Sequence, residues 1–404
     1  MKFGILTTKH HDGFCLWDSD YSEFDVANIP WRDGKGDVVE EYVNAFRSHG
    51  LEPCLYYSIW DNTEGIGNGP ITDAHMEIIE GQLTEILSDY GDISMLFIDG
   101  WSWKMGHVEV PYPRIRELVK ALQPNCLLID NTHLPCLYNN DLIHYEAGGS
   151  CPSDNTLPAL LSKLIYTGGG NSWFWDSKIP TANLMSAKSI QSNLNYLEPR
   201  WCTFILNCPP NDEGLLDDNI VERLQEVGQL WSPDLTRPEL PDQDPQIETF
   251  ILPVSASATS GDANHAIDGK NDRFDYSVWE FADDLPQSLT IDLGHVYEGV
   301  NILYYVPKYV PMVSPRKEGS IQSYRIEASL NGTEYAEIAS GTWNGDAKMK
   351  VATFPPANVR YLRLEILSAV EGFAAVTEIA IGKGDPAKTT VSEAAGLAAC
   401  VYLA

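Results

Sequence analysis

The sequence lacks the features that place a protein in a membrane or on nucleic acid. No stretch approaches the roughly 18 consecutive apolar residues of a membrane span, because Asp, Gly or Asn interrupts the longest hydrophobic runs. Basic residues are scarce, with 27 Lys and Arg against 57 Asp and Glu, and the formal net charge is −30. Such a surface repels phosphate backbones and anionic headgroups. We therefore expect a soluble protein that binds neither nucleic acid nor membranes, and we interpret the charge as a solubility feature.

Export signals and cysteine-based metal motifs are also missing. The opening MKFGILTTKHHDGF runs directly into a strand pattern, without the basic and apolar regions or cleavage site of a signal peptide. We expect a cytoplasmic protein as given, or a secreted one if the N-terminus is truncated. The eight cysteines show no Cys-x-x-Cys spacing. We expect reduced core thiols, with a Cys136–Cys151 disulfide as the alternative.

Up to about residue 231, short β-rich runs alternate with amphipathic helical stretches, which is typical of βα units. The predicted strands are Phe3–Thr8, Pro53–Ser58, Ser94–Asp99, Cys126–Asp130, Asp141–Glu146, Asn171–Trp175 and Thr203–Asn207. The predicted helices are Asp37–His49, Thr72–Tyr90, Pro111–Leu122, Leu157–Tyr166, Ala182–Tyr196 and Asp217–Trp231. Polar and aromatic residues gather where these strands end, as on the catalytic face of a (β/α)8 TIM barrel. Seven strands are one short of eight, so we expect an α/β barrel truncated at its N-terminus.

The second half of the chain has a different pattern. Residues 232–256 contain five prolines and are predicted to be a linker that follows a barrel over residues 1–231. From 257 to 386, alternating runs separated by turn signals such as Asn331-Gly332 predict an antiparallel β-sandwich. Residues 387–404 fit neither domain and are expected to form a tail.

Two carboxylates stand at predicted strand ends. Asp99 ends the apolar run Ser-Met-Leu-Phe-Ile-Asp, and Gly100 then lets the backbone turn sharply. Glu146 ends a later strand and precedes Ala147-Gly148-Gly149. A pair of acids at one barrel face suits glycoside hydrolysis, in which one attacks or positions water and the other protonates the leaving oxygen. For either acid alone, an N-cap or a solvated loop residue is an equal alternative.

Histidine and tryptophan accompany these acids. His10 and His11 are adjacent rather than spaced as His-x-His, so a metal-dependent hydrolase is a less favoured alternative. Two imidazoles at a strand end can instead donate and accept hydrogen bonds to a polyol. Tryptophans such as Trp173 follow several strands, and aromatic rings stack on the apolar faces of sugars. Packing in the outer layer of the barrel is the alternative for each tryptophan.

Several long motifs occur in a specific order: LTTKHHDGFCLWDS, PWRDGKGDVVEEYVNAFRSHGL, LYYSIWD, MLFIDG and FILNCPPNDEGLLDDN. In this order the chain resembles the α-L-fucosidases of glycoside hydrolase family 29 over about residues 2–231. The segment from Trp31 to Val39 is more similar to the subfamily that acts on α-1,3/1,4-linked fucose.

The resemblance assigns roles to individual residues. It implies that Asp99 is the nucleophile and Glu146 the acid/base of one branch of the family. It further implies that His10 and His11 hold fucose hydroxyls and that Tyr57 is a sugar-site tyrosine. Trp173 matches an aromatic residue that faces the methyl side of the sugar.

These roles imply a retaining exo-α-L-fucosidase that needs no cofactor for catalysis and acts on fucosylated oligosaccharides or glycoconjugates. Nucleophile and acid/base should lie about 5–5.5 Å apart and form a covalent fucosyl-enzyme. Two departures stand out: the family's first strand with its His-Trp-Gly motif is missing, and an arginine is replaced around Asp130–His133. Each lost hydrogen bond to the sugar costs about 1–3 kcal/mol. The alternatives are a catalytically weakened glycan-binding protein, or a homo-oligomer that repairs the gap.

The second domain carries its own motifs, Ala-Ile-Asp-Gly-Lys-Asn-Asp over 266–272 and Val-Thr-Glu-Ile over 376–379. With these it resembles the discoidin or coagulation factor 5/8 type C sandwich, as found in family 32 carbohydrate-binding modules. The resemblance implies a structural calcium ion with Asp268, Asp272 and Glu378 as candidate ligands, because calcium prefers hard oxygen donors. An ordinary turn at Asp268-Gly269 is the alternative.

Overall fold

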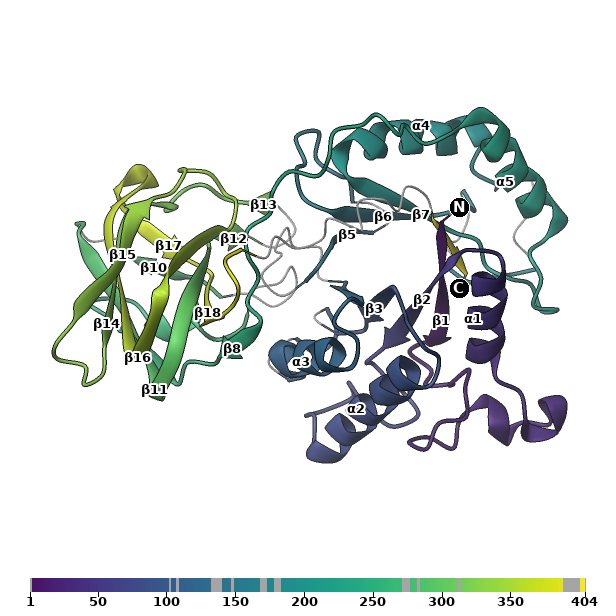
Figure 1. Ribbon diagram of the computed structural model, residues 1–404, viewed down its shortest axis with the longest axis horizontal. Helices are drawn as coiled ribbons and strands as arrows, with labels where there is room; N and C mark the ends of the chain where they lie inside the picture. Colours follow the sequence, from purple (N-terminus) through teal and green to yellow (C-terminus); the bar gives the residue numbers. More distant parts are fainter. Residues whose placement is uncertain are drawn as a thin grey trace.

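A barrel and a β-sandwich lie side by side in the computed structural model of the chain (Figure 1). It describes residues 2–101, 103–106, 109–131, 140–146, 149–167, 173–177, 183–270, 277–281, 284–310, 314–387 and 400–403. None of the helices in these ranges is long and apolar enough to cross a membrane.

The barrel is a parallel sheet with helices packed around it, which confirms the predicted (β/α) barrel. Its strands are β1 (Phe3–Lys9), β2 (Glu52–Ser58), β3 (Met95–Asp99), β4 (Leu127–Asp130), β5 (Ile143–Tyr145), β6 (Ala159–Leu164), β7 (Cys202–Asn207) and β19 (Cys400–Leu403). Its helices are α1 (Val38–Ser48), α2 (Asp73–Ser88), α3 (Tyr112–Leu122), α4 (Ala187–Leu197) and α5 (Asp218–Leu230). Side chains cap the starts of α1, α2 and α4, as at Thr72, whose side chain accepts the His75 amide.

The strand order is β4-β3-β2-β1-β19-β7-β6-β5, so the last strand of the chain lies between the first and the seventh. Phe3 is in register with Cys400, and Tyr402 with Asn207. The two chain ends accordingly meet in the barrel wall (Figure 1). The expectation that residues 387–404 belong to neither domain is therefore wrong for 400–403. A strand at this place satisfies backbone donors and acceptors that β1 and β7 would otherwise leave unpaired.

One helix prediction is also wrong. Residues predicted as the helix Leu157–Tyr166 contain strand β6 instead. The run Ala-Leu-Leu-Ser-Lys-Leu is almost continuously apolar, and periodicity cannot distinguish a short buried parallel strand from a buried helix. Of the predicted strand Asn171–Trp175, residues 171 and 172 lie outside the described residues, and residues 173–175 form no strand.

Strands β4 and β5 stand at the two ends of the sheet order, and we call the junction between them the β4–β5 seam. Side chains close much of it. Asp141 accepts the Leu128 amide at 2.7 Å, and the Asn140 side chain accepts the Asp130 amide at 3.1 Å. The seam thus depends on side chains from the β4–β5 connection.

The predicted linker packs against this seam. Gln243, Gln246 and Ile247 are buried. The Arg116 guanidinium donates to Gln246 Oε1 at 2.6 Å, and Gln246 Nε2 donates to the Asn140 carbonyl at 2.8 Å. The connection between the domains is therefore fixed to the barrel by buried polar contacts.

The C-terminal domain is antiparallel, as predicted, but its first strand, Thr249–Ile251, lies inside the predicted linker 232–256, so that boundary is wrong. Its sheet of seven strands consists of β8 (Thr249–Ile251), β9 (Ser255–Ala258), β11 (Gln287–Val306), β14 (Ile321–Ser329), β15 (Ala336–Thr342), β16 (Lys350–Ala369) and β18 (Glu378–Lys383). Two shorter pairs join β10 (Trp279–Phe281) to β17 (Ala374–Val376) and β12 (Tyr309–Val310) to β13 (Ser314–Pro315). Trp279 and Tyr305 are buried in one continuous apolar core.

The described cysteines follow the prediction of reduced thiols. Cys15, Cys54, Cys126, Cys151, Cys202 and Cys208 are free and buried. The alternative bridge between Cys136 and Cys151 involves a residue, Cys136, that lies outside the described residues.

Candidate active site

A cavity of about 440 Å³ opens at the carboxyl ends of the barrel strands. Five of the six residues predicted for the barrel site line it: His10, His11, Asp99, Glu146 and Trp173. The tertiary structure therefore brings together side chains from the ends of β1, β3 and β5 and from a later loop.

Strand alternation explains which side chains reach this cavity. Ile5 and Thr7 of β1 line it, and so do Phe97 and Asp99 of β3. Strict alternation would also turn Lys9 inward. A register shift between Thr7 and Lys9 turns that lysine to the outside instead, where it contacts Asp61 and Gln82. A bulge of this kind re-aims the following residues, and the chain then continues into His10 and His11 at the cavity.

Tyr57 does not reach the cavity, which contradicts its predicted contact with sugar. It is fully buried on the outer side of β2, where its hydroxyl donates to Gln82 Oε1 at 2.8 Å and accepts from Lys9 Nζ at 3.2 Å. Its neighbour Tyr56 points inward and lines the cavity. The two residues of the Tyr-Tyr pair lie on opposite faces because successive strand side chains alternate. The sequence motif could not say which of the two faces inward.

Asp99 is held by an unusual number of donors. Its Oδ1 accepts from the Gly100 amide at 2.6 Å, from Trp103 Nε1 at 2.7 Å and from Asn131 Nδ2 at 3.4 Å. Its Oδ2 accepts from the Tyr56 hydroxyl at 2.6 Å. Burial alone would raise the pKa of Asp99, but the hydrogen bonds from Tyr56, Trp103 and Gly100 outweigh burial and lower the pKa below the usual aspartate value. The carboxylate is therefore ionised at neutral pH.

Gly100 is required for this arrangement. Its φ of +64° lies in the left-handed region, and a Cβ there would come within 2.6 Å of Trp60 Cβ and 2.9 Å of Ser58 Oγ. The sharp turn brings the Gly100 amide onto the carboxylate of the preceding residue.

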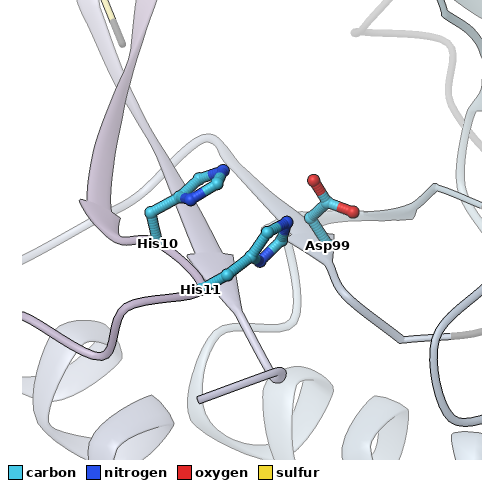
Figure 2. A group of neighbouring side chains, drawn as sticks. All are labelled: His10, His11 and Asp99. Atoms are coloured by element: carbon cyan, nitrogen blue, oxygen red, sulfur yellow. The ribbon is translucent and has the colours of Figure 1, made fainter. Parts of the chain in front are cut away.

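The two imidazoles point toward Asp99 from the loop that follows β1 (Figure 2). Ser58 Oγ donates to the Trp60 carbonyl at 2.7 Å, so it accepts from His11 Nδ1, which lies 2.7 Å away. His11 thus carries its proton on Nδ1 and presents Nε2 as an acceptor. Burial, reinforced by His10, lowers the pKa of His11 to about 4. Burial also lowers the pKa of His10, against the opposing charges of Asp99 and Asp12.

A metal ion is the alternative use of these groups. Among the described residues, ligand atoms of His10, His11 and Asp99 lie within 4.8 Å of one another. However, four N–H and O–H donors already face the oxygens of Asp99. A carboxylate surrounded by such donors is better suited to carry a negative charge than to share its lone pairs with a cation. The donor set therefore favours a nucleophile or base at Asp99.

Glu146 follows β5 directly and lines the same cavity as Asp99. Aromatic residues contribute to the lining as well. Phe174 contacts the edge of the His10 ring at a centroid distance of 4.9 Å and remains 46% exposed, and Trp173 lies next to it in the chain. The site thus combines two acids, two neutral imidazoles and an apolar aromatic surface.

Sequence reasoning missed several residues that line the cavity: Tyr56, Asn131, His144, Ser162 and Phe174. The face of Tyr56 follows from its pairing with Phe97 in the β2–β3 ladder, which is a tertiary contact. Trp103, one of the tryptophans that follow the predicted strands, lines the cavity and donates to Asp99. Asn131 and His144 carry no local sequence signal.

The proposed calcium ligands are partly described. Glu378 is buried and accepts the Gly269 amide at 3.0 Å. Burial first, and the nearby Asp268 second, raise the pKa of Glu378 well above the usual glutamate value. Asp268 accepts from Ser277 Oγ at 2.7 Å. Asp272 lies outside the described residues. Two close carboxyl groups, one of them buried, fit a cation site.

Comparison with known proteins adds independent evidence. The α-L-fucosidase family profile matches residues 1–232, and the F5/8 type C domain profile matches residues 253–379. Alpha-L-fucosidase 1 of Arabidopsis thaliana is 29% identical over 255 residues, which cover 56% of this chain and 48% of that protein. An α-L-fucosidase of Dictyostelium discoideum is 24% identical over 242 residues, covering 57% and 51% of the two chains. The chain spans about half the length of these curated relatives.

A solved structure is similar as well. The α-L-fucosidase of Lactobacillus casei in complex with α-L-fucose product is 23% identical, with a TM-score of 0.47, over 57% of this chain and 75% of that one.

Proposed function

Because the chain belongs to the α-L-fucosidase family, we propose that it is a retaining exo-α-L-fucosidase that releases terminal fucose from glycans. The observation that carries the proposal is the environment of Asp99. An ionised carboxylate, fixed by four donors, shares one cavity with a second acid, Glu146. Retaining glycoside hydrolysis requires such a pair.

The hydrogen bonds suggest which oxygen attacks. Oδ1 of Asp99 is occupied by the donors of Gly100, Trp103 and Asn131, whereas Oδ2 accepts from Tyr56. Oδ2 therefore attacks the anomeric carbon while Glu146 donates its proton to the departing glycosidic oxygen. The now ionised Glu146 then takes a proton from water, whose oxygen displaces Asp99 and restores the free carboxylate.

The remaining groups suit the sugar. His11 offers Nε2 as an acceptor for a hydroxyl proton, and the neutral His10 ring stands beside it at a centroid distance of 3.9 Å. Phe174 and Trp173 supply an apolar surface for the methyl side of fucose. The motif from Trp31 to Val39 supports α-1,3/1,4-linked fucose as the substrate.

The test is fucose release from an aryl α-L-fucoside and from a Lewis-type trisaccharide. We expect Asp99→Asn to lower kcat more than about 1,000-fold, and the exposed Asp89→Asn to leave it unchanged as a matched control. Release by Asp99→Asn at the wild-type rate would refute the nucleophile. Fucose binding without release by the wild-type protein would instead support a glycan-binding protein.

Glu146 can be tested separately. We expect Glu146→Ala to slow hydrolysis of the aryl fucoside about 10²- to 10⁴-fold. Azide should restore turnover and give a fucosyl azide with the anomeric configuration of the substrate, because it attacks the same covalent intermediate as water. A product of inverted configuration would contradict the assignment of Glu146 as acid/base.

We further propose that the C-terminal domain holds a structural calcium ion through Asp268 and Glu378. The support is the buried Glu378 carboxyl, whose charge a cation would compensate. Calcium binding should release a proton and raise the melting temperature of the wild-type chain. Glu378→Gln should abolish both effects, while the exposed Glu334→Gln should retain them. Equal calcium responses in all three proteins would contradict the site.

A further inference from the structure

Three buried side chains form a continuous hydrogen-bond chain that ends on Asp99. Ser162 Oγ lies 2.8 Å from His144 Nε2, His144 Nδ1 lies 2.8 Å from Asn131 Oδ1, and Asn131 Nδ2 lies 3.4 Å from Asp99 Oδ1. The chain crosses the barrel from β6 through β5 and the end of β4 to β3. Asn131, His144 and Ser162 are 5%, 3% and 6% exposed. We infer that His144 is a positioning residue that fixes the Asn131 amide against the nucleophile; this inference rests on the proposed function.

The charge of Asp99 determines the direction of every bond in the chain. An ionised carboxylate can only accept, so the Asn131 amide turns its NH₂ group to Asp99 and its carbonyl oxygen to His144. His144 Nδ1 must then donate its proton to that oxygen. In the neutral ring Nε2 is bare and accepts from the Ser162 hydroxyl. His144 is therefore the Nδ1–H tautomer, and all three donors point toward Asp99.

The position of Asn131 explains why it needs this support. It follows the last residue of β4, at the β4–β5 seam, where the sheet order ends. The ladder with β3 ends at Asp130, and among the described residues no ladder holds Asn131 on the β5 side. His144, from the middle of β5, provides the contact across the seam. The imidazole is itself held from the other side by Ser162 of β6 and by the edge of Phe97.

The hydrogen-bond chain matters because the charge of Asp99 changes twice in the proposed reaction. The carboxylate loses its charge when it forms the fucosyl ester and regains it when water displaces it from the anomeric carbon. A fixed N–H aimed at Oδ1 stabilises the carboxylate as its charge returns, without reorganisation. It also keeps Oδ1 engaged, so that Oδ2 remains the attacking oxygen. Loss of this hydrogen-bond chain should consequently lower kcat more than it changes KM.

The first experiment compares kinetic constants of variants on an aryl α-L-fucoside. We expect His144→Leu to lower kcat about tenfold with KM changed less than about twofold, because the Asn131 hydrogen bond to the charged Asp99 carboxylate is no longer held in place. His144→Gln, whose side-chain amide can still donate to Asn131, should recover most of this loss. The exposed His49→Leu serves as the control. Equal kcat for His144→Leu and wild type, or equal losses for the Leu and Gln variants, would overturn the inference.

The second experiment needs neither activity nor a folded variant at position 144. Nitrogen NMR of histidine-labelled wild-type protein should show the rings of both His11 and His144 as neutral, protonated at Nδ1 and unprotonated at Nε2 near neutral pH. Ser162→Ala should shift the Nε2 signal of His144 and leave that of His11 unchanged. A His144 ring protonated at Nε2 and bare at Nδ1 would refute the hydrogen-bond chain. If wild type releases no fucose but shows the predicted tautomer, the proposed function fails while the chain of contacts stands.

Discussion

The strands around the cavity form two walls, β1–β3 and β4–β6, and backbone ladders join neighbouring strands in both except at the β4–β5 seam. Backbone ladders run without interruption from β1 through β2 to β3, and the fully buried Lys9–Asp61 ion pair, at 2.8 Å, supports them from behind. Between β4 and β5, a backbone hydrogen bond joins the Asp141 amide to the Leu128 carbonyl at 3.0 Å. Side chains supply further contacts there, with Asp141 paired to Arg116 at 3.2 Å and to Lys120 at 2.6 Å. Arg116 also donates to Gln246, which belongs to the connection between the two domains.

The two walls also carry different residues of the proposed reaction. The proposed nucleophile, Asp99, lies on the wall whose backbone ladders are continuous, while the proposed acid/base, Glu146, and the Asn131–His144 contact lie beside the seam. A regular sheet thus sets the position of Asp99. Glu146 lies beside tertiary contacts that extend to the interdomain connection. Four substitution experiments test this comparison.

We expect the largest effect from Lys9→Met. The change leaves the Asp61 carboxylate, which is fully buried, without its cation. An uncompensated buried charge should lower the free energy of unfolding by about 3–5 kcal/mol. Urea unfolding measures this value, and Lys188→Met, an exposed position on α4, is the matched control. A loss below about 1 kcal/mol would show that the ion pair does not support the β1–β3 wall.

Tyr56 and Tyr57 test the two faces of β2. Tyr56→Phe removes a donor to Asp99 and should raise the pKa of that carboxyl, because the ionised form loses a hydrogen bond. We expect kcat for fucose release to fall about 10- to 100-fold, as for a hydrogen bond of about 1.5–3 kcal/mol to a charged group. Tyr57→Phe should reduce stability by about 1 kcal/mol and leave kcat nearly unchanged. The reverse pattern would place Tyr57 at the substrate.

Arg116→Met should have a smaller effect than Lys9→Met. Asp141 keeps Lys120 and the Leu128 amide, so its charge remains compensated. We expect a loss of about 1–2 kcal/mol in the free energy of unfolding. Amide hydrogen exchange should become faster around residues 140–146 and stay unchanged in β2. Equally faster hydrogen exchange in both regions would mean that the β4–β5 seam is not stabilised independently of the β1–β3 wall.

The smallest effect is a pH dependence of stability from His11. Its pKa is lowered to about 4 in the folded chain from the usual 6.5. Between these pH values the unfolded chain binds a proton that the folded chain does not, so the folded state loses stability as pH falls through this window. We expect the free energy of unfolding, measured with urea at about pH 7, 5.5 and 4.5, to fall less steeply with decreasing pH for His11→Gln than for wild type. The exposed His49→Gln is the control. Equal pH dependence in His11→Gln and wild type would contradict the buried neutral imidazole.

Residues close together in the sequence were predictable, and those joined across the barrel were not. Asp99 could be identified because an acid followed by glycine ends a strongly apolar strand, and strand β6 could not because a short buried strand and a helix share the same apolar pattern. The face of Tyr56 requires knowledge of which residue of β3 it pairs with. His144 and Ser162 lie on two different strands and Asn131 follows a third, and their contacts depend on a register that no local pattern encodes.

The sequence by itself determined the succession of βα units, the sandwich that follows them, and the placement of Asp99, Glu146 and the histidine pair at strand ends. These features depend on periodicity and on local backbone geometry, which neighbouring residues specify. Only the tertiary structure decided that Tyr56 rather than Tyr57 faces the cavity, that Cys400–Leu403 lies between β1 and β7, and that His144 reaches Asn131. Those outcomes depend on strand register and on barrel closure, because both bring together residues that are far apart along the chain.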